Sequence, residues 1–299
     1  MSDAFTQHAL SYGPKGAEWL RQIPAIISKY ETKWSIHVSH PFSLNYNYVA
    51  SATRKDGTPA VLKIGFPEDT EFKTEMEALV LYNGEGCVKL LEIDRGRSIV
   101  LLERIVPGNP LSDVTDDEKA TRIIASVIQN LWKPLPSHHT FLPVSEWIRA
   151  IPDYKEKYKS SPGPIPMILV DQAHALFTEL ITTSETPVLI HGDLHHDNIL
   201  WSDRNGWRAI DPKGIAAEKA YEAAAMIRNP YERMKSVPNV QNVLHKRIMI
   251  LSEELGPDAK RIHKWCIAQT VLSAVWSVGT SKGPEHAVYI AEALNAITI

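Results

Sequence analysis

The chain has 299 residues, of which 44% are hydrophobic and 22% are charged, the ordinary composition of a soluble globular protein. Its net charge of −3 argues against a general nucleic-acid binder, and its two cysteines, Cys87 and Cys266, exclude a disulfide framework. The first residues lack the basic and apolar regions of a signal peptide, and the longest apolar stretches are too short to cross a bilayer. We therefore expect a cytoplasmic protein without a membrane partner, large enough for one domain or two lobes.

The N-terminal third begins with an amphipathic helix and continues with strands. Residues 14–31 place apolar side chains at helical spacing, namely Trp19, Leu20, Ile23, Ile26 and Ile27. Three strand-like stretches follow, KWSIHVSHPF, NYNYVASATR and PAVLKIGF. The Asp56-Gly57 dipeptide between the last two predicts a hairpin.

A second helix and two more strands complete this third. The stretch DTEFKTEMEALVLYNGEG predicts a helix that ends at its glycines and buries Phe72, Met76, Leu79 and Val80. The stretch CVKLLEIDRGRSIVLLERI predicts two strands joined at residues 94–97.

The sequence pattern changes after Pro107-Gly108, which we interpret as the joint between two lobes. Helices are predicted over residues 115–132, 143–159 and 166–183, and again from about residue 217 to the end. The predicted fold class is therefore α+β, with a β-rich first part and a mostly helical second part.

The stretch HGDLHHDN carries the strongest chemical signal. Asp193 and Asn198 are separated by four residues, as in the catalytic loop of kinases. An aspartate there can accept the hydrogen bond of an attacking hydroxyl, and an asparagine carbonyl just beyond it can bind magnesium. We expect both side chains to face one cleft.

The following stretch, NILWSDRNGWRAIDP, predicts a hairpin that turns at Asn205-Gly206. The hairpin would bring Asp211 back to the vicinity of Asn198. Asp211 then has the place of the metal-binding aspartate of kinases. One carboxylate and one amide oxygen, with phosphate oxygens and water, form a plausible shell for magnesium.

A kinase also needs a cation for the nucleotide phosphates. Lys63 ends the strand PAVLKIG in the apolar-apolar-Lys pattern of kinases. On the following helix, Glu75 is the preferred partner for Lys63 and Glu77 is the alternative. Alone, a lysine at a strand end and a glutamate on a helix usually face solvent. Their significance depends on the company of Asp193, Asn198 and Asp211.

These motifs, with HGDLHHDNIL, AIDPKG and YEAAAMIRNP, resemble the kinase-like aminoglycoside phosphotransferase superfamily. Within it, they are most similar to the branch of streptomycin 6-phosphotransferases and hydroxyurea-resistance kinases, over about residues 41–276. The resemblance implies a bilobal protein-kinase-like fold. A β-rich nucleotide-binding lobe would span residues 1–104, and a helical lobe with the catalytic loop and substrate site would span residues 105–299.

The resemblance also implies the ligands. ATP would bind with its phosphates at Lys63 and its adenine at the backbone from Glu103 to Ile105. Mg²⁺ would bind Asn198 and Asp211, while Asp193 would act on the acceptor. The acceptor would be a hydroxyl of an aminoglycoside such as streptomycin, a cationic small molecule. No protein partner is implied, and His191 would support the catalytic loop.

Two features depart from the kinase pattern. The hairpin that covers the phosphates is usually rich in glycine, but SLNYNYVASA has none. Ser43, Asn45 and Asn47 are candidates to donate hydrogen bonds there instead. Asp211 is followed by Pro212-Lys213 rather than Phe-Gly, and no Ala-Pro-Glu segment follows, so we do not expect a protein substrate.

Several alternatives remain open at this point. A zinc site at His191, His195 and His196 is disfavoured, because adjacent histidines diverge and no thiol is near. A serine hydrolase is disfavoured because no G-x-S-x-G turn is present. Glu222 either anchors its helix to the catalytic loop, the interpretation we favour, or helps to hold a cationic substrate. Lys213 either contacts phosphate or caps the hairpin. A metabolic kinase for a sugar, an amine-alcohol or homoserine, and a non-catalytic nucleotide-binding module, are the competing functions.

Overall fold

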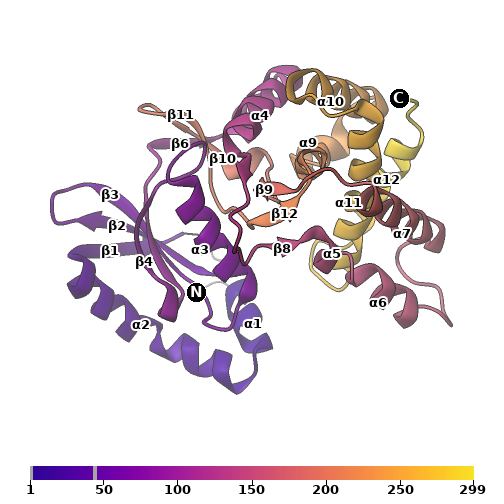
Figure 1. The fold of residues 1–299 in the computed structure, drawn as a ribbon. Coiled ribbons are helices and arrows are strands. Elements are labelled where there is room, and N and C mark those ends of the chain that lie inside the picture. The colour runs from indigo at the N-terminus through magenta and orange to yellow at the C-terminus, as the bar shows by residue number, and fades with distance from the viewer. Residues whose placement is uncertain (1–2, 43–45) are drawn as a thin grey trace.

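The computed structural model describes residues 3–42 and 46–299, which form a β-rich lobe and a larger helical lobe (Figure 1). The first lobe is built on a five-stranded antiparallel sheet with the order β1-β2-β3-β5-β4. Its strands are β1 (Ile36–Pro41), β2 (Tyr48–Arg54), β3 (Pro59–Ile64), β4 (Leu90–Asp94) and β5 (Ile99–Glu103).

The turn between β2 and β3 confirms the predicted hairpin. Gly57 has a φ of 84°, a left-handed conformation that glycine adopts without steric cost. The Asp56 carboxylate accepts a hydrogen bond from the Thr58 backbone N–H at 2.9 Å. The local chemistry of Asp-Gly therefore sets the register that brings Lys63 opposite Val49 and Val100 in the middle of the sheet.

Two helices, α1 (Asp3–Ser11) and α2 (Pro14–Trp34), lie along one side of this sheet (Figure 1). The prediction of a helix over residues 14–31 is confirmed, whereas α1 was not predicted. Phe5 of α1 packs against Trp19 of α2 and Tyr48 of β2, so α1 helps to close the core of this lobe.

Helix α3 (Thr70–Tyr82) lies between the sheet and the helical lobe. Its first turn is capped by Asp69, whose carboxylate accepts hydrogen bonds from two backbone N–H groups. Phe72, Met76 and Leu79 are buried as predicted, but Val80 is 40% exposed. The expectation for Val80 was wrong because it lies on the outer face of α3, where no strand covers it.

The chain enters the helical lobe through β6 (Pro107–Pro110), which pairs with a second hairpin. This hairpin consists of β10 (Ile199–Ser202) and β11 (Gly206–Ala209), and it turns at Asn205-Gly206 as predicted. The three strands form a small sheet of order β11-β10-β6. The residues that follow Asn198 are thereby attached to the segment that joins the lobes.

A second small sheet has the order β7-β9-β12-β8. It comprises β7 (Lys133–Pro134), β8 (Leu142–Pro143), β9 (Val188–Ile190) and β12 (Ile215–Ala217). Strand β9 leads directly into His191, and β12 follows Gly214. Their antiparallel pairing therefore brings the beginning and the end of the motif together.

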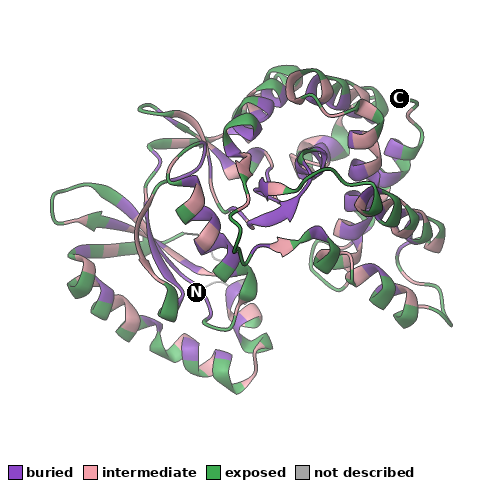
Figure 2. Ribbon diagram, in the orientation of Figure 1, coloured by how far each residue is buried: buried purple, intermediate pink, exposed green. Residues whose placement is uncertain are grey.

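Helices form the rest of this lobe, and α11 packs in its centre against α7, α8, α10 and α12. Figure 2 shows the buried residues gathered on the facing sides of these helices. The bounds are α4 (Asp117–Leu131), α5 (Val144–Trp147), α6 (Ala150–Lys157), α7 (Met167–Thr182), α8 (Ala224–Ile227), α9 (Tyr231–Ser236), α10 (Val240–Leu255), α11 (Ala259–Ser277) and α12 (Glu285–Asn295). The helix predicted over 143–159 is interrupted between α5 and α6, at residues 148–149.

Both cysteines, Cys87 and Cys266, are free and fully buried. None of the helices in the described residues is both long enough and apolar enough to cross a membrane.

Candidate active site

The junction of the two lobes holds an ion cluster centred on Lys63. Its ammonium nitrogen lies 2.5 Å from Glu75 Oε1 on α3 and 3.1 Å from Asp211 Oδ1 in the helical lobe. Lys63 is 3% exposed, so the β3 strand delivers its charge into the interior. The alternative partner, Glu77, instead pairs with Arg95 on the outer face of α3. The preference for Glu75 is therefore the one that the structure supports.

Lys63 and Asp211 support each other's charge, whereas at Glu75 burial outweighs the Lys63 ammonium and raises the pKa of the carboxyl to about 7. Burial opposes the charge of Lys63, but the Asp211 and Glu75 carboxylates outweigh it and raise the pKa of the lysine. Burial likewise opposes the charge of Asp211, and the Lys63 ammonium outweighs it and lowers the pKa of the aspartate. Because the Asp211 side chain is 53% exposed, water screens part of this attraction. The cluster thus presents an ionised carboxylate to solvent at the lobe junction.

The catalytic loop is held by two buried side chains. The ring of His191 bridges the loop, because its Nε2 lies 2.8 Å from the Ile210 carbonyl and its Nδ1 accepts the Asp193 backbone N–H at 3.2 Å. The Glu222 carboxylate accepts the backbone N–H groups of His191 at 2.6 Å and of Gly192 at 3.0 Å. These bonds fix the backbone just before Asp193 without using its side chain.

The ionisation of these two groups fits a structural role. Burial lowers the pKa of His191 to about 4, so the ring is neutral near pH 7 and can accept through Nδ1 while donating through Nε2. Burial raises the pKa of Glu222 to about 7, partly offset by the two backbone hydrogen bonds.

Asp193, Asn198 and Asp211 are gathered by the loop and the hairpin. The Asn198 amide nitrogen donates to the Asp193 carbonyl at 3.0 Å, which leaves the Asn198 Oδ1 oxygen without a protein hydrogen bond in the described part of the chain. The Ile210 N–H donates to the Asn198 carbonyl at 2.9 Å, so Asp211 follows directly beside Asn198. Asp211 has a φ of 58°, a left-handed conformation that turns its side chain towards Lys63.

One residue near Asp193 escaped the sequence analysis. Arg228, just after α8, has its Nη2 nitrogen 4.0 Å from Asp193 Oδ1 and its Nη1 hydrogen-bonded to Gln269 of α11. Its side chain is 13% exposed. No local pattern could have revealed it, because Arg228 follows Asp193 by 35 residues (228 − 193) and the motif YEAAAMIRNP predicts a helix.

The other residues expected to contact the nucleotide lie at the joint between the lobes and around the start of β2. The Glu103 side chain accepts the Lys89 N–H at 2.8 Å, and the Glu103 N–H donates to the Lys89 carbonyl at 2.9 Å, so both groups are engaged beside β4. Ile105 is buried beside the joint. Ser43 and Asn45 lie outside the described residues, and Asn47 is half-buried at the start of β2.

The three histidines of the motif do not converge. His191 binds the Ile210 carbonyl, His195 Nδ1 accepts the Asp197 N–H, and His196 is fully buried with its pKa lowered to about 2 by burial. Among the described residues, no group of three His, Cys, Asp or Glu side chains is placed to hold a metal ion. The motif instead offers one amide oxygen and one carboxylate.

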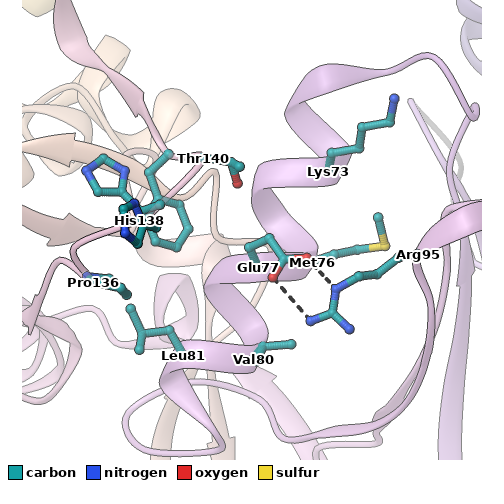
Figure 3. A pocket seen from close by; sticks show the side chains of 11 residues that line it. Lys73, Met76, Glu77, Val80, Leu81, Arg95, Pro136, His138 and Thr140 are labelled. Carbon is teal, nitrogen blue, oxygen red and sulfur yellow. Dashed lines mark hydrogen bonds and ion pairs between the residues drawn. The ribbon is translucent and has the colours of Figure 1, made fainter.

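A separate pocket of about 550 Å³ lies on the outer face of α3 (Figure 3). Figure 3 shows the Glu77–Arg95 pair on one side of it and His138 on the other. Its lining does not include any member of the Lys63 cluster or of the catalytic loop. This pocket is therefore separate from the residues at the lobe junction.

Comparison with known proteins agrees with this geometry. Residues 36–280 match the family model described as aminoglycoside/hydroxyurea antibiotic resistance kinase. A streptomycin 6-kinase from Streptomyces glaucescens is 26% identical, covering 96% of this chain and 94% of that protein. A hydroxyurea phosphotransferase from Kitasatospora aureofaciens is 27% identical, covering 94% and 82% respectively.

Solved structures confirm the predicted bilobal kinase-like fold. The choline kinase LicA from Streptococcus pneumoniae matches with a TM-score of 0.63 at 16% identity, over 93% of this chain and 100% of that chain. The aminoglycoside phosphotransferase APH(4)-Ia matches with a TM-score of 0.60 at 13% identity, over 92% and 97%. Since the family model spans most of the sequence, the chain belongs to the aminoglycoside/hydroxyurea antibiotic resistance kinase family.

Proposed function

We propose that this protein transfers the γ-phosphoryl group of ATP to a hydroxyl of a small molecule, and that the acceptor is an aminoglycoside such as streptomycin. The observation that carries the proposal is the Lys63 ammonium, which contacts Glu75 of one lobe and Asp211 of the other at the same time. The streptomycin kinases among the relatives support the acceptor class.

In this proposal ATP lies between the lobes. Its phosphates contact Lys63, and its adenine contacts the backbone of Glu103 and Ile105. Residues 1–104 supply most of the nucleotide contacts, and residues 105–299 supply the catalytic loop and the acceptor site. The free state of both buried thiols supports a reducing, cytoplasmic location.

The residues present fit a magnesium ion. The Asn198 Oδ1 oxygen and the Asp211 carboxylate are hard oxygen donors on adjacent parts of the hairpin. When bound, magnesium would neutralise charge on the β- and γ-phosphate oxygens. Lys63 holds Asp211 in place for this task, and Glu75 in turn holds Lys63.

Asp193 acts on the acceptor. Its side chain is 33% exposed while its backbone is fixed through His191 and through Asn198, so the carboxylate is accessible and positioned. It orients the acceptor hydroxyl and takes its proton as the oxygen attacks phosphorus. Positioning and electrostatics supply most of the rate enhancement in such a reaction.

The decisive experiment replaces Asp193 by alanine and measures phosphate transfer from ATP to streptomycin and related acceptors. We expect turnover to fall by about 10²–10⁴-fold while nucleotide binding, measured by calorimetry, is retained. Asp203→Ala, which removes an exposed carboxylate from the neighbouring hairpin turn, is the matched control and should leave turnover unchanged. Turnover of Asp193→Ala close to wild type would contradict the assignment. Binding of magnesium-ATP by wild type without any phosphorylated product would favour a non-catalytic module.

A further inference from the structure

A second lysine, Lys213, lies at the lobe junction and is anchored through its backbone to both sides. Its N–H donates to the His191 carbonyl of the catalytic loop at 2.8 Å. Its carbonyl accepts the Thr74 hydroxyl of α3, also at 2.8 Å. The position of this residue is therefore set by main-chain contacts, and its side chain is left for another use.

The side chain of Lys213 starts beside the catalytic loop. A Cβ atom built on Gly192, the residue before Asp193, would lie 3.4 Å from the Lys213 Cβ. Gly214, which follows with a φ of 68°, passes so close to α3 that a Cβ there would lie 2.7 Å from the Thr74 carbonyl. The chain therefore brings Lys213 into the narrow space between Asp193 and the first turns of α3.

The ammonium of Lys213 has a weak, replaceable partner. It lies 3.0 Å from Glu71 Oε2 and 5.8 Å from the centre of the Tyr46 ring. The Glu71 side chain is 54% exposed and that of Lys213 is 32% exposed, and exposed pairs of this kind contribute little net free energy. The Lys63 side chain, by contrast, is 4% exposed and contacts two carboxylates. Lys213 is the lysine that can exchange its partner.

Lys213 also remains a cation there, because its ammonium lies 3.0 Å from a carboxylate oxygen of Glu71 and an ordinary lysine is charged near pH 7. A positive charge on a side chain that starts beside Gly192 suits a reaction whose negative charge spreads over three phosphoryl oxygens.

Building on the proposed function, we propose that Lys213 exchanges Glu71 for the phosphoryl group in transit and is a catalytic residue. As the bond between the acceptor oxygen and the γ-phosphorus forms, the bond from that phosphorus to the β–γ bridging oxygen breaks. The electron pair of the broken bond leaves on ADP, and the hydroxyl proton passes to Asp193. Lys213 neutralises the equatorial oxygens from the acceptor side, while Lys63 serves the nucleotide side.

A structural alternative assigns Lys213 only the task of tying the lobes together through Glu71. The two accounts differ in what happens when Glu71 alone is changed. Glu71→Gln breaks the ion pair but leaves the Lys213 ammonium in place, whereas Lys213→Met removes the charge. Because the main chain of Lys213 is held independently of its side chain, we expect both variants to fold, which thermal melting checks.

The test compares Lys213→Met, Lys213→Arg, Glu71→Gln and the double variant in steady-state phosphate transfer. We expect Lys213→Met to lower kcat by about 10²–10³-fold, and Lys213→Arg to recover part of the loss. Glu71→Gln should change kcat by no more than about fivefold. Equal losses of kcat in Glu71→Gln, Lys213→Met and the double variant would overturn the proposal. They would show that Lys213 only joins the two lobes through Glu71.

A binding measurement separates this proposal from the choice of acceptor. ADP with aluminium fluoride imitates the phosphoryl group in transit and needs no particular acceptor. We expect Lys213→Met to weaken binding of ADP–aluminium fluoride by at least about tenfold more than binding of ADP alone. Equal weakening of both would overturn the role of Lys213. Failure of wild type to phosphorylate streptomycin would instead count against the proposed acceptor only.

Discussion

Two buried ion pairs in this molecule use the same chemistry for different ends. The Lys63 cluster joins the lobes and ends in Asp211, whose side chain is 53% exposed. The Arg247 cluster lies inside the helical lobe, where the guanidinium is completely buried and holds Asp117 at 2.5 and 3.0 Å. Its remaining nitrogen donates to the carbonyls of Met226, Ile227 and Asn229.

The difference shows which buried charges can bind a ligand and which only stabilise the fold. All three guanidinium nitrogens of Arg247 are hydrogen-bonded to protein atoms, so the guanidinium has no nitrogen left for a ligand. The Lys63 cluster keeps a carboxylate that solvent reaches, so a metal ion or a phosphate can bind without breaking the protein interior. Burial of a charge alone therefore does not separate a functional site from a structural one.

The largest expected effect on stability comes from breaking the Arg247 cluster. Arg247→Ala leaves Asp117 and three carbonyls without their partner, and we expect the free energy of unfolding to fall by about 3–5 kcal/mol. Urea unfolding followed by circular dichroism measures this loss. Lys246→Ala, which removes the neighbouring exposed pair with Glu118, is the control and should cost less than about 1 kcal/mol. Similar losses in both variants would remove the basis of the comparison.

A substitution in the Lys63 cluster should instead lower the enzymatic activity. Lys63→Met removes the cation proposed to contact the phosphates, and we expect kcat/KM for ATP to fall by about 10²–10³-fold. Lys55→Met, at the exposed turn between β2 and β3, removes the same charge away from the site and should leave the kinetics unchanged. A Lys63→Met enzyme with unaltered kinetics for ATP would contradict the role of the cluster.

Glu222 sharpens the comparison, because this buried carboxylate binds backbone N–H groups and no cation. Its pKa is raised from 4.5 to about 7, so between these values the folded protein keeps a proton that the unfolded chain has released. The contribution of Glu222 to wild-type stability should therefore fall as pH rises through this window. Glu222→Gln removes this titration, and its stability relative to wild type should rise with pH by on the order of 3 kcal/mol at most.

Urea unfolding of both proteins between pH 5 and 7.5 measures this trend. Glu253→Gln, at a side chain that is 70% exposed, is the control and should run parallel to wild type. Parallel curves for Glu222→Gln and wild type would show that the buried carboxylate does not titrate in this range.

Local patterns in the sequence were sufficient for most of the ion cluster. The spacing from Asp193 to Asn198 and the turn at Asn205-Gly206 act over short stretches of chain, where hairpin geometry decides which side chains meet. Lys63 and Glu75 are also close in sequence, on a strand and the helix that follows it. Such neighbours meet through the regular geometry of one hairpin or one strand–helix unit.

The contacts that escaped the sequence join distant segments. Thr74 and Lys213 are 139 residues apart, and their hydrogen bond depends on how the lobes approach each other. Arg228 meets Asp193 only because α8 packs against α11 beneath the loop. The interruption between α5 and α6, by contrast, has a local cause, because Pro152 lacks the N–H that would bond the Ile148 carbonyl in a continuous helix. Tertiary contacts decided the positions of Lys213 and Arg228, and no local pattern carries them.

The burial of both cysteines has a practical consequence for measuring lobe movement. Cys87 and Cys266 are the chain's two thiols and both are fully buried, and burial raises the pKa of each, so neither should react readily with a labelling reagent. Cysteines introduced at exposed positions, such as Lys55 in one lobe and Glu253 in the other, could carry a pair of spin labels without removal of the native thiols. The separation of the lobes could then be followed directly as nucleotide and acceptor bind.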